Sequence, residues 1–120
     1  MSDQTNNREM TPTERRLVIW MLEQGNNQAQ AFLPQVDRLR ITPWRCPCGC
    51  ASVNFIQEGQ AEPTEGMRIL GDYVFAEDGN EIGIFIFECG GVLSGIEVYG
   101  LGGDAARSLP TPKECRPFGA

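Results

Sequence analysis

The stretch that decides the fold is residues 68–99, RILGDYVFAEDGNEIGIFIFECGGVLSGIEVY. Apolar residues alternate with other residues along most of it, and two turn signals, Asp78-Gly79 and Cys89-Gly90-Gly91, divide it. Alternation with a period of two is typical of strands, and the short turns favour antiparallel neighbours. The pattern therefore predicts a meander of three strands, at residues 68–76, 81–88 and 92–99.

The middle strand of this meander is apolar on both faces. Its isoleucines point to one side and its phenylalanines to the other; they are Ile82, Ile84, Ile86, Phe85 and Phe87. Such a strand is expected to be interior and covered on both sides, with the isoleucines beneath the helices. In the third strand, Gly95 indicates a bulge or a close approach of another backbone.

Two helical segments are predicted upstream of the meander. Thr11, Pro12 and Glu14 form a T-P-x-E helix start, and apolar residues recur at helical spacing after it. A second, poorer helix is predicted over residues 28–38, with a kink or break near Pro34. Period-two patterns predict two further short strands, within residues 38–42 and 52–57.

The predicted fold is α+β, with two N-terminal helical segments packed on a four- to five-stranded, mainly antiparallel sheet. Residues 1–10 lack apolar periodicity and are predicted to be a disordered tail, which leaves residues 11–120 as one domain. The last twenty residues, with three prolines, are expected to run as an extended segment over the domain.

Charge is distributed unevenly along the chain, whose formal net charge is -6. Residues 58–104 carry ten acidic residues and only one basic residue, Arg68, so this half repels phosphate backbones and argues against nucleic acid as the ligand. No apolar segment is long enough for a membrane span, and the first ten residues are polar, unlike a secretory signal. A cytoplasmic location without membrane attachment is expected.

Three of the five cysteines, Cys46, Cys48 and Cys50, fall within the segment CPCGC. A zinc ion needs four ligands, and because the chain has no histidine the fourth must be Cys89, Cys115 or a carboxylate. Alternate side chains of an extended strand lie about 6.5–7 Å apart, so the thiols can share an ion only if the segment turns sharply. No second C-x-x-C pair accompanies the segment, and zinc stays a possibility rather than a requirement.

Three alternatives for the CPCGC segment remain open. Soft thiolate ligands also suit copper(I). A redox thiol needs a lowered pKa, which Arg45 favours at Cys46 because it precedes that residue directly. In the third alternative the cysteines are simply small residues that fill a crowded turn.

The sequence contains few of the residue patterns that indicate an enzyme. The absence of histidine excludes every catalytic triad that uses imidazole, and residues 90–103 are rich in glycine but lack a phosphate-binding motif, so no nucleotide cofactor is predicted. Glu88 and Glu97 lie on neighbouring predicted strands and form a possible carboxylate pair, with Asp72 and Tyr73 beside Glu88.

The leading hypothesis from the sequence is a non-enzymatic binding protein that uses an acidic sheet surface against a basic partner protein. An immunity-type protein that neutralises a toxin is one concrete version. The candidate partner-binding residues are Glu77, Asp78, Glu81, Glu88 and Glu97.

Four short segments together suggest a family. They are T-P-x-E-R from Thr11, C-x-C-G-C-x-S from Cys46, LSGIEVY from Leu93 and L-P from Leu109. In this order the chain resembles a family of short, uncharacterised bacterial proteins over about residues 11–117. The resemblance implies a bacterial, cytoplasmic, stand-alone domain and transfers no catalytic residue.

Overall fold

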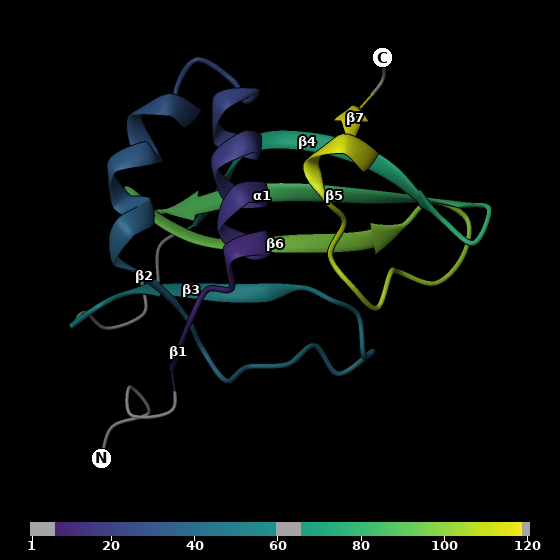
Figure 1. Cartoon of the computed structure of the whole chain (residues 1–120), viewed down its shortest axis with the longest axis horizontal. Helices are drawn as coiled ribbons and strands as arrows, with labels where there is room; N and C mark the ends of the chain where they lie inside the picture. Colours follow the sequence, from purple (N-terminus) through teal and green to yellow (C-terminus); the bar gives the residue numbers. More distant parts are fainter. Residues whose placement is uncertain (1–6, 60–65, 119–120) are drawn as a thin grey trace.

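The strands form one antiparallel sheet in the order β1-β2-β3-β6-β5-β4-β7, in a computed structural model that describes residues 7–59 and 66–118. In chain order the elements are β1 (Arg8–Glu9), α1 (Pro12–Glu23), η2 (Ala29–Arg38), β2 (Leu39–Ile41), β3 (Val53–Gln57), β4 (Met67–Glu77), β5 (Asn80–Cys89), β6 (Val92–Gly100), η3 (Pro112–Glu114) and β7 (Arg116–Pro117). Figure 1 shows the two N-terminal helical segments in front of this sheet. The α+β class is confirmed.

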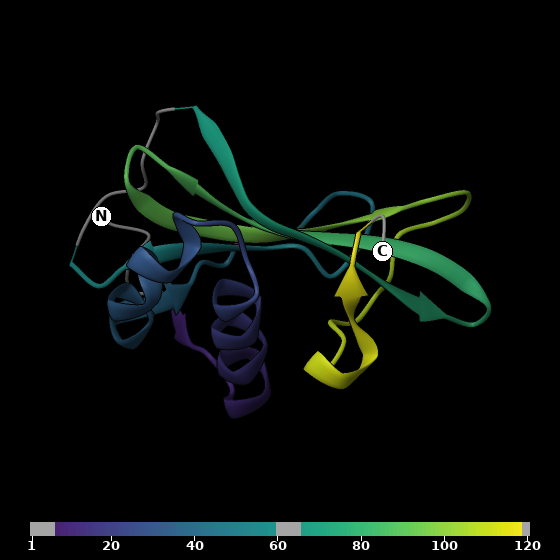
Figure 2. The ribbon, with the colours of Figure 1, turned by 90° about the horizontal axis from the view of Figure 1, so that it is seen from above.

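The predicted meander is confirmed as β4, β5 and β6, with β5 in the interior. Asp78 and Gly79 join β4 to β5 with φ of 54° and 81°, the left-handed backbone that a two-residue hairpin turn requires. Ile82, Ile84 and Ile86 are at most 1% exposed and belong to the main core. Figure 2 shows that the helices cover one face of the sheet, so these isoleucines pack beneath them as predicted.

The other face of the meander is covered by its own aromatic side chains. The ring of Phe85 lies 5.9 Å from the rings of both Phe87 and Tyr99, measured between centroids. Phe85 is 9% exposed, although no helix packs over it. Large rings at neighbouring positions of paired strands shield one another, so Phe85 is buried while Phe87 and Tyr99 around it are half-buried.

The first helix, α1, begins as its sequence predicts. The Thr11 side chain accepts from the backbone N–H of Glu14, and the Glu14 carboxylate accepts from the backbone N–H of Thr11, which completes a capping box. One face of the helix is buried in the core, by Leu17, Val18, Met21 and Leu22.

The second helical segment, η2, is a 3-10 helix over all ten residues rather than a kinked α-helix. Pro34 lies inside it; its ring has no N–H to donate, and an α-helical geometry at that point would press the ring against the preceding turn. The tighter winding keeps Ala29 and Val36 buried against the core.

The predicted number of strands, four to five, is wrong because the sheet has two more at its edges. Arg8–Glu9 pairs with β2, although it falls within the predicted disordered tail; residues 1–6 of that tail lie outside the described residues. Arg116–Pro117 pairs with β4. Each added strand has two residues, too few to show an alternating pattern, and pairing with a neighbour decides its conformation.

The connection from β2 to β3 carries the CPCGC segment along one edge of the sheet (Figure 1). Its end is fixed to the segment that follows β6, because the backbone N–H of Ala51 donates to the carbonyl of Ala106 at 2.9 Å. Within the described ranges, no helix is long and apolar enough to cross a membrane.

Candidate functional site

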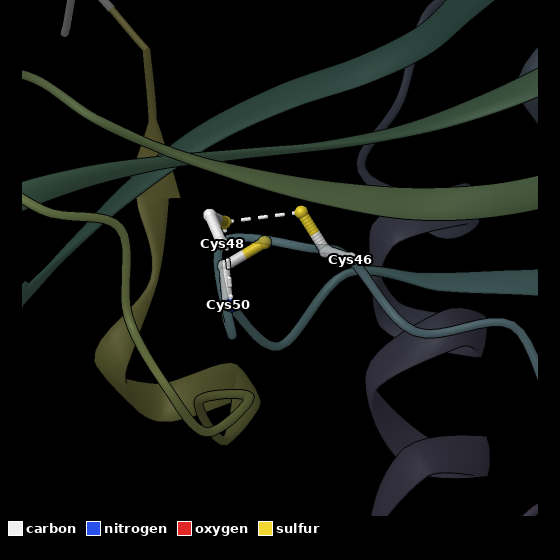
Figure 3. A group of neighbouring side chains, drawn as sticks. All are labelled: Cys46, Cys48 and Cys50. Carbon is white, nitrogen blue, oxygen red and sulfur yellow. Dashed lines mark hydrogen bonds between the residues drawn. The ribbon is translucent and has the colours of Figure 1, made fainter.

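The thiols of Cys46, Cys48 and Cys50 converge on one loop (Figure 3). All three sulfur atoms lie within 4.8 Å of one another, and the sulfurs of Cys46 and Cys48 are 3.0 Å apart. The three cysteines are free rather than joined in disulfides. Three unlinked thiols that face a common point are a potential ligand set for a soft metal ion.

A tight turn removes the spacing problem that the sequence posed. The backbone N–H of Gly49 donates to the carbonyl of Cys46 at 2.9 Å, which closes a four-residue turn. Gly49 has a φ of 86°, a conformation that glycine adopts without steric cost. The backbone N–H of Cys50 then points at the Cys48 sulfur, 3.4 Å away, so the chain folds its alternate side chains together.

Ser52 anchors the end of this loop to the sheet. Its side-chain oxygen accepts from the backbone N–H of Val98 at 3.0 Å and also lies 3.2 Å from the sulfur of Cys50. Ser52 is 8% exposed, whereas Cys46 and Cys50 are half-buried and Cys48 is exposed. The interpretation that the cysteines merely fill a crowded turn does not account for the exposed Cys48.

The thiols of Cys46 and Cys50 differ in pKa. Burial raises the pKa of Cys50, but hydrogen bonds with Ser52 and with the other two thiols outweigh burial and lower this pKa to about 7. The hydrogen bond shared with Cys48 raises the pKa of Cys46 to about 11. The expectation that Arg45 favours a thiolate at Cys46 is therefore wrong. Of Cys46 and Cys50, Cys50 has the lower pKa.

A cavity of about 400 Å³ opens beside the thiols. Cys46 and Cys50 line it together with three arginines, Arg8, Arg45 and Arg107, and no aspartate or glutamate is among its lining residues. The rest of its wall consists of Ile41, Thr42, Pro43, Trp44, Gly49, Ala51, Ser52 and Val53. The cavity is thus locally cationic, in a chain whose net charge is -6.

The cluster offers three ligands to a metal ion. Cys89 and Cys115, the proposed fourth ligands, are not part of it, and within residues 7–59 and 66–118 no carboxylate joins it. In a zinc tetrahedron with Zn–S bonds of about 2.3 Å, the sulfurs are about 3.8 Å apart. This separation lies between the 3.0 Å that joins the Cys46 and Cys48 sulfurs and the 4.8 Å within which all three lie, so small side-chain movements are needed to seat the ion.

The predicted acidic surface is not formed as a unit. Glu88 is only 1% exposed, and its carboxylate accepts from Arg68 at 2.7 Å and from the backbone N–H of Gly91 at 2.8 Å. Its inclusion among the partner-binding residues is corrected, because a buried, paired carboxylate cannot contact a partner. Glu81 is engaged too, in an ion pair of 2.6 Å with Arg116, while Glu97 is exposed.

Two more of the acidic residues lie at the tip of the β4–β5 hairpin. Glu77 and Asp78 line a cavity of about 330 Å³ there, with Asp104 and Arg107 among the other lining residues. They are therefore grouped with the loop after β6 rather than with Glu97, which pairs with Phe85 in the middle of β5.

The predicted carboxylate pair is absent. Glu88 lies opposite Leu93, and Glu97 lies opposite Phe85, so the two glutamates do not face each other. Tyr73 and Asp72, which were proposed beside Glu88, form hydrogen bonds with other residues. The Tyr73 hydroxyl donates to the Met21 carbonyl at 2.6 Å, and the Asp72 carboxylate accepts from the Tyr99 hydroxyl at 3.0 Å. These positions do not form an acid–base site.

Sequence reasoning missed Arg107, and it quoted Ser52 only as part of the C-x-C-G-C-x-S segment, without a role. Arg107 reaches the cysteine loop from the segment after β6, and its guanidinium lies so close to Gly49 that a Cβ there would be 2.7 Å from Nη1. No local pattern links two positions so far apart in the chain. Ser52 had a local signal, since a hydroxyl two residues after a cysteine in a turn is within reach of that thiol.

No family model, curated protein or solved structure matches the chain. The resemblance to a family of short bacterial proteins stays a prediction.

Proposed function

We propose that this protein binds a zinc ion through the thiolates of Cys46, Cys48 and Cys50. One observation carries the proposal: three unlinked sulfur atoms lie within 4.8 Å of one another, on a five-residue segment whose turn brings them together. Thiolates are among the preferred ligands of zinc, and the sulfurs of Cys46 and Cys48, 3.0 Å apart, need to separate only to about 3.8 Å to fit its tetrahedral geometry.

Protonation supports the same assignment. At neutral pH the Cys50 thiol is already partly ionised, because its pKa is about 7. Cys46 keeps its proton at this pH, because the hydrogen bond shared with Cys48 raises its pKa to about 11, and a metal ion replaces such protons when it binds. Zinc binding is therefore expected to release protons and to weaken as the pH falls.

The number of ligands bears on the kind of zinc site. Structural zinc sites are closed by four protein ligands, whereas catalytic and exchangeable sites have three and keep one position open. The cluster supplies three, and two of them line a cavity. This arrangement favours a site with an exchangeable fourth ligand.

The acidic-surface hypothesis receives less support than the zinc site. Of its five residues, Glu88 is buried and Glu81 is already paired with Arg116. Recognition of a basic partner protein remains a prediction that rests on Glu77, Asp78 and Glu97.

Metal content tests the zinc proposal. Protein purified under reducing conditions without added metal, or reconstituted with one equivalent of zinc and then desalted, is analysed for zinc. We expect one zinc per chain in the unmodified protein and in Cys89→Ser, whose thiol lies outside the cluster. We expect at least a tenfold loss of zinc affinity in Cys48→Ser, because a serine hydroxyl or a water molecule binds zinc more weakly than the lost thiolate.

Two results would contradict the zinc proposal. One is unmodified protein that retains no zinc after reconstitution and desalting. The other is Cys48→Ser and Cys89→Ser proteins with equal zinc affinity, because ligand loss must separate the two serine variants.

A further inference from the structure

We propose that the fourth position of the metal site takes the oxyanion group of a small molecule, a phosphate or a carboxylate, held by Arg45 and Arg107. This inference rests on the proposed zinc site and names the chemical class of ligand that the site receives. It is carried by the position of the thiols in the wall of a cavity that is lined by arginines and by no acidic residue.

Two of the three arginines are available for an anion. Arg8 is already held by Glu14, whose two carboxylate oxygens each accept from its guanidinium at 2.9 Å. Neither Arg45 nor Arg107 takes part in any of the five ion pairs found among residues 7–59 and 66–118. Both are exposed and line the cavity, and Arg107 also borders the neighbouring cavity that Glu77, Asp78 and Asp104 line.

Arg107 is placed against the cysteine turn itself. Its Nη1 atom would be 2.7 Å from a Cβ at Gly49, the residue between Cys48 and Cys50. The hydrogen bond from Ala51 to the carbonyl of Ala106 fixes the segment that presents this arginine. Since Gly49 has no side chain, the guanidinium can lie directly against the turn that carries the thiols.

Charge balance explains why an anion suits this place. A zinc ion with three thiolates carries one net negative charge, and an anionic fourth ligand adds to it. Two unpaired guanidinium groups at the same cavity offset that repulsion, and their planar forks match the oxygen geometry of phosphate and carboxylate. The cavity of about 400 Å³ is far larger than the roughly 30 Å³ that one water occupies in the liquid, so it has room for a small molecule.

Cobalt(II) in place of zinc provides the measurement, because its visible absorption reports ligands that enter its coordination shell. The cobalt-loaded protein is titrated with inorganic phosphate, with acetate and with chloride in separate arms at constant ionic strength. We expect a saturable spectral change with phosphate or acetate and none with chloride; the arm that saturates at lower concentration identifies the oxyanion.

Variants connect the spectral change to the arginines. The double variant Arg45→Gln/Arg107→Gln should bind cobalt normally and should bind the oxyanion at least tenfold more weakly, because it loses two charge-assisted contacts. Each single variant should show part of that loss. Arg16→Gln is the matched control, because Arg16 is an exposed arginine of α1 outside the cavity lining.

The outcomes separate the two proposals. Failure to bind cobalt contradicts the metal site, and the inference falls with it. Cobalt binding with no response to either oxyanion overturns the inference and leaves the metal site standing. An equal response in the double variant and in Arg16→Gln also overturns it, because the arginines then have no part in holding the ligand.

Discussion

Glu88 carries a carboxylate into the protein interior near the end of β5. Its side chain is 2% exposed, while that of its partner Arg68 is 67% exposed. The second carboxylate oxygen accepts from the backbone N–H of Gly91, which closes the turn into β6. This glutamate therefore stabilises a hairpin. Removal of Arg68 leaves a buried charge without a partner, whereas removal of the Glu88 charge leaves only a solvated arginine.

Replacement of the exposed member should cost more than a conservative change of the buried one. Arg68→Met leaves a buried carboxylate without its cation, at a cost of about 2–3 kcal/mol in the free energy of unfolding. This cost is below the roughly 3–5 kcal/mol of fully buried pairs because Arg68 is solvated. Glu88→Gln keeps an acceptor for Gly91 and removes the charge, for about 1 kcal/mol.

Urea unfolding of the two single variants and of the double variant measures these costs. The double variant should be more stable than the sum of the two single losses implies, because it leaves no unpaired charge. Equal losses for the two single changes, with strict additivity, would refute this role of the pair.

The Tyr73 hydroxyl makes the folding stability of the protein fall at alkaline pH. Burial raises its pKa to about 12, and the hydroxyl donates to the Met21 carbonyl at 2.6 Å. Because the folded pKa exceeds the unfolded value near 10, the contribution to stability is complete below pH 10 and is lost as the pH rises toward 12. The loss should be on the order of 2 kcal/mol.

Tyr73→Phe removes this titration. Its unfolding free energy should be lower than that of the unmodified protein at pH 8 and should fall less steeply between pH 10 and 12. Denaturant unfolding at several alkaline pH values compares the two slopes. Parallel slopes would show that Tyr73 does not titrate with unfolding.

At the level of elements, β3 is joined to the meander through a close approach at Gly95. Asn54 and Gly95 are paired, and a Cβ at position 95 would lie 2.6 Å from the Val53 carbonyl and 2.8 Å from the Phe87 ring. Only a residue without a side chain allows β3 and β6 to pair here. The junction also orients the loop before β3, which carries the cysteines.

Gly95→Ala should therefore destabilise the sheet by about 2–3 kcal/mol, because backbone and a packed ring both have to move. Gly103→Ala is the matched control, since a Cβ there meets nothing within 4 Å. Thermal unfolding of both variants measures the difference. The account of this junction fails if the two variants melt at the same temperature.

Elements with strong local signals were predictable from the sequence. The Asp78-Gly79 turn and the buried Ile82, Ile84 and Ile86 set the meander, and the capping box set the start of α1. The edge strands were not predictable, because two residues show no period and their pairing depends on distant partners. The 3-10 winding of η2 was not predictable either, since Pro34 indicates that the helix is distorted but not which helical form replaces it.

For the molecule as a whole, the candidate site combines segments that are far apart in the chain. The thiols were predictable because CPCGC contains three ligands in five residues, but their convergence depends on the turn at Gly49. The approach of Arg107 requires the complete sheet, which brings the segment after β6 against the loop before β3. Glu88 was misplaced for the same reason, because its burial depends on Arg68 from another strand.

X-ray absorption at the zinc edge counts the sulfur atoms around the bound metal. For zinc-loaded protein we predict three sulfur neighbours at about 2.3 Å and one oxygen or nitrogen neighbour, with two sulfurs remaining in Cys48→Ser. A first shell of oxygen and nitrogen alone would contradict the thiolate site, and a shell of four sulfurs would contradict its open fourth position.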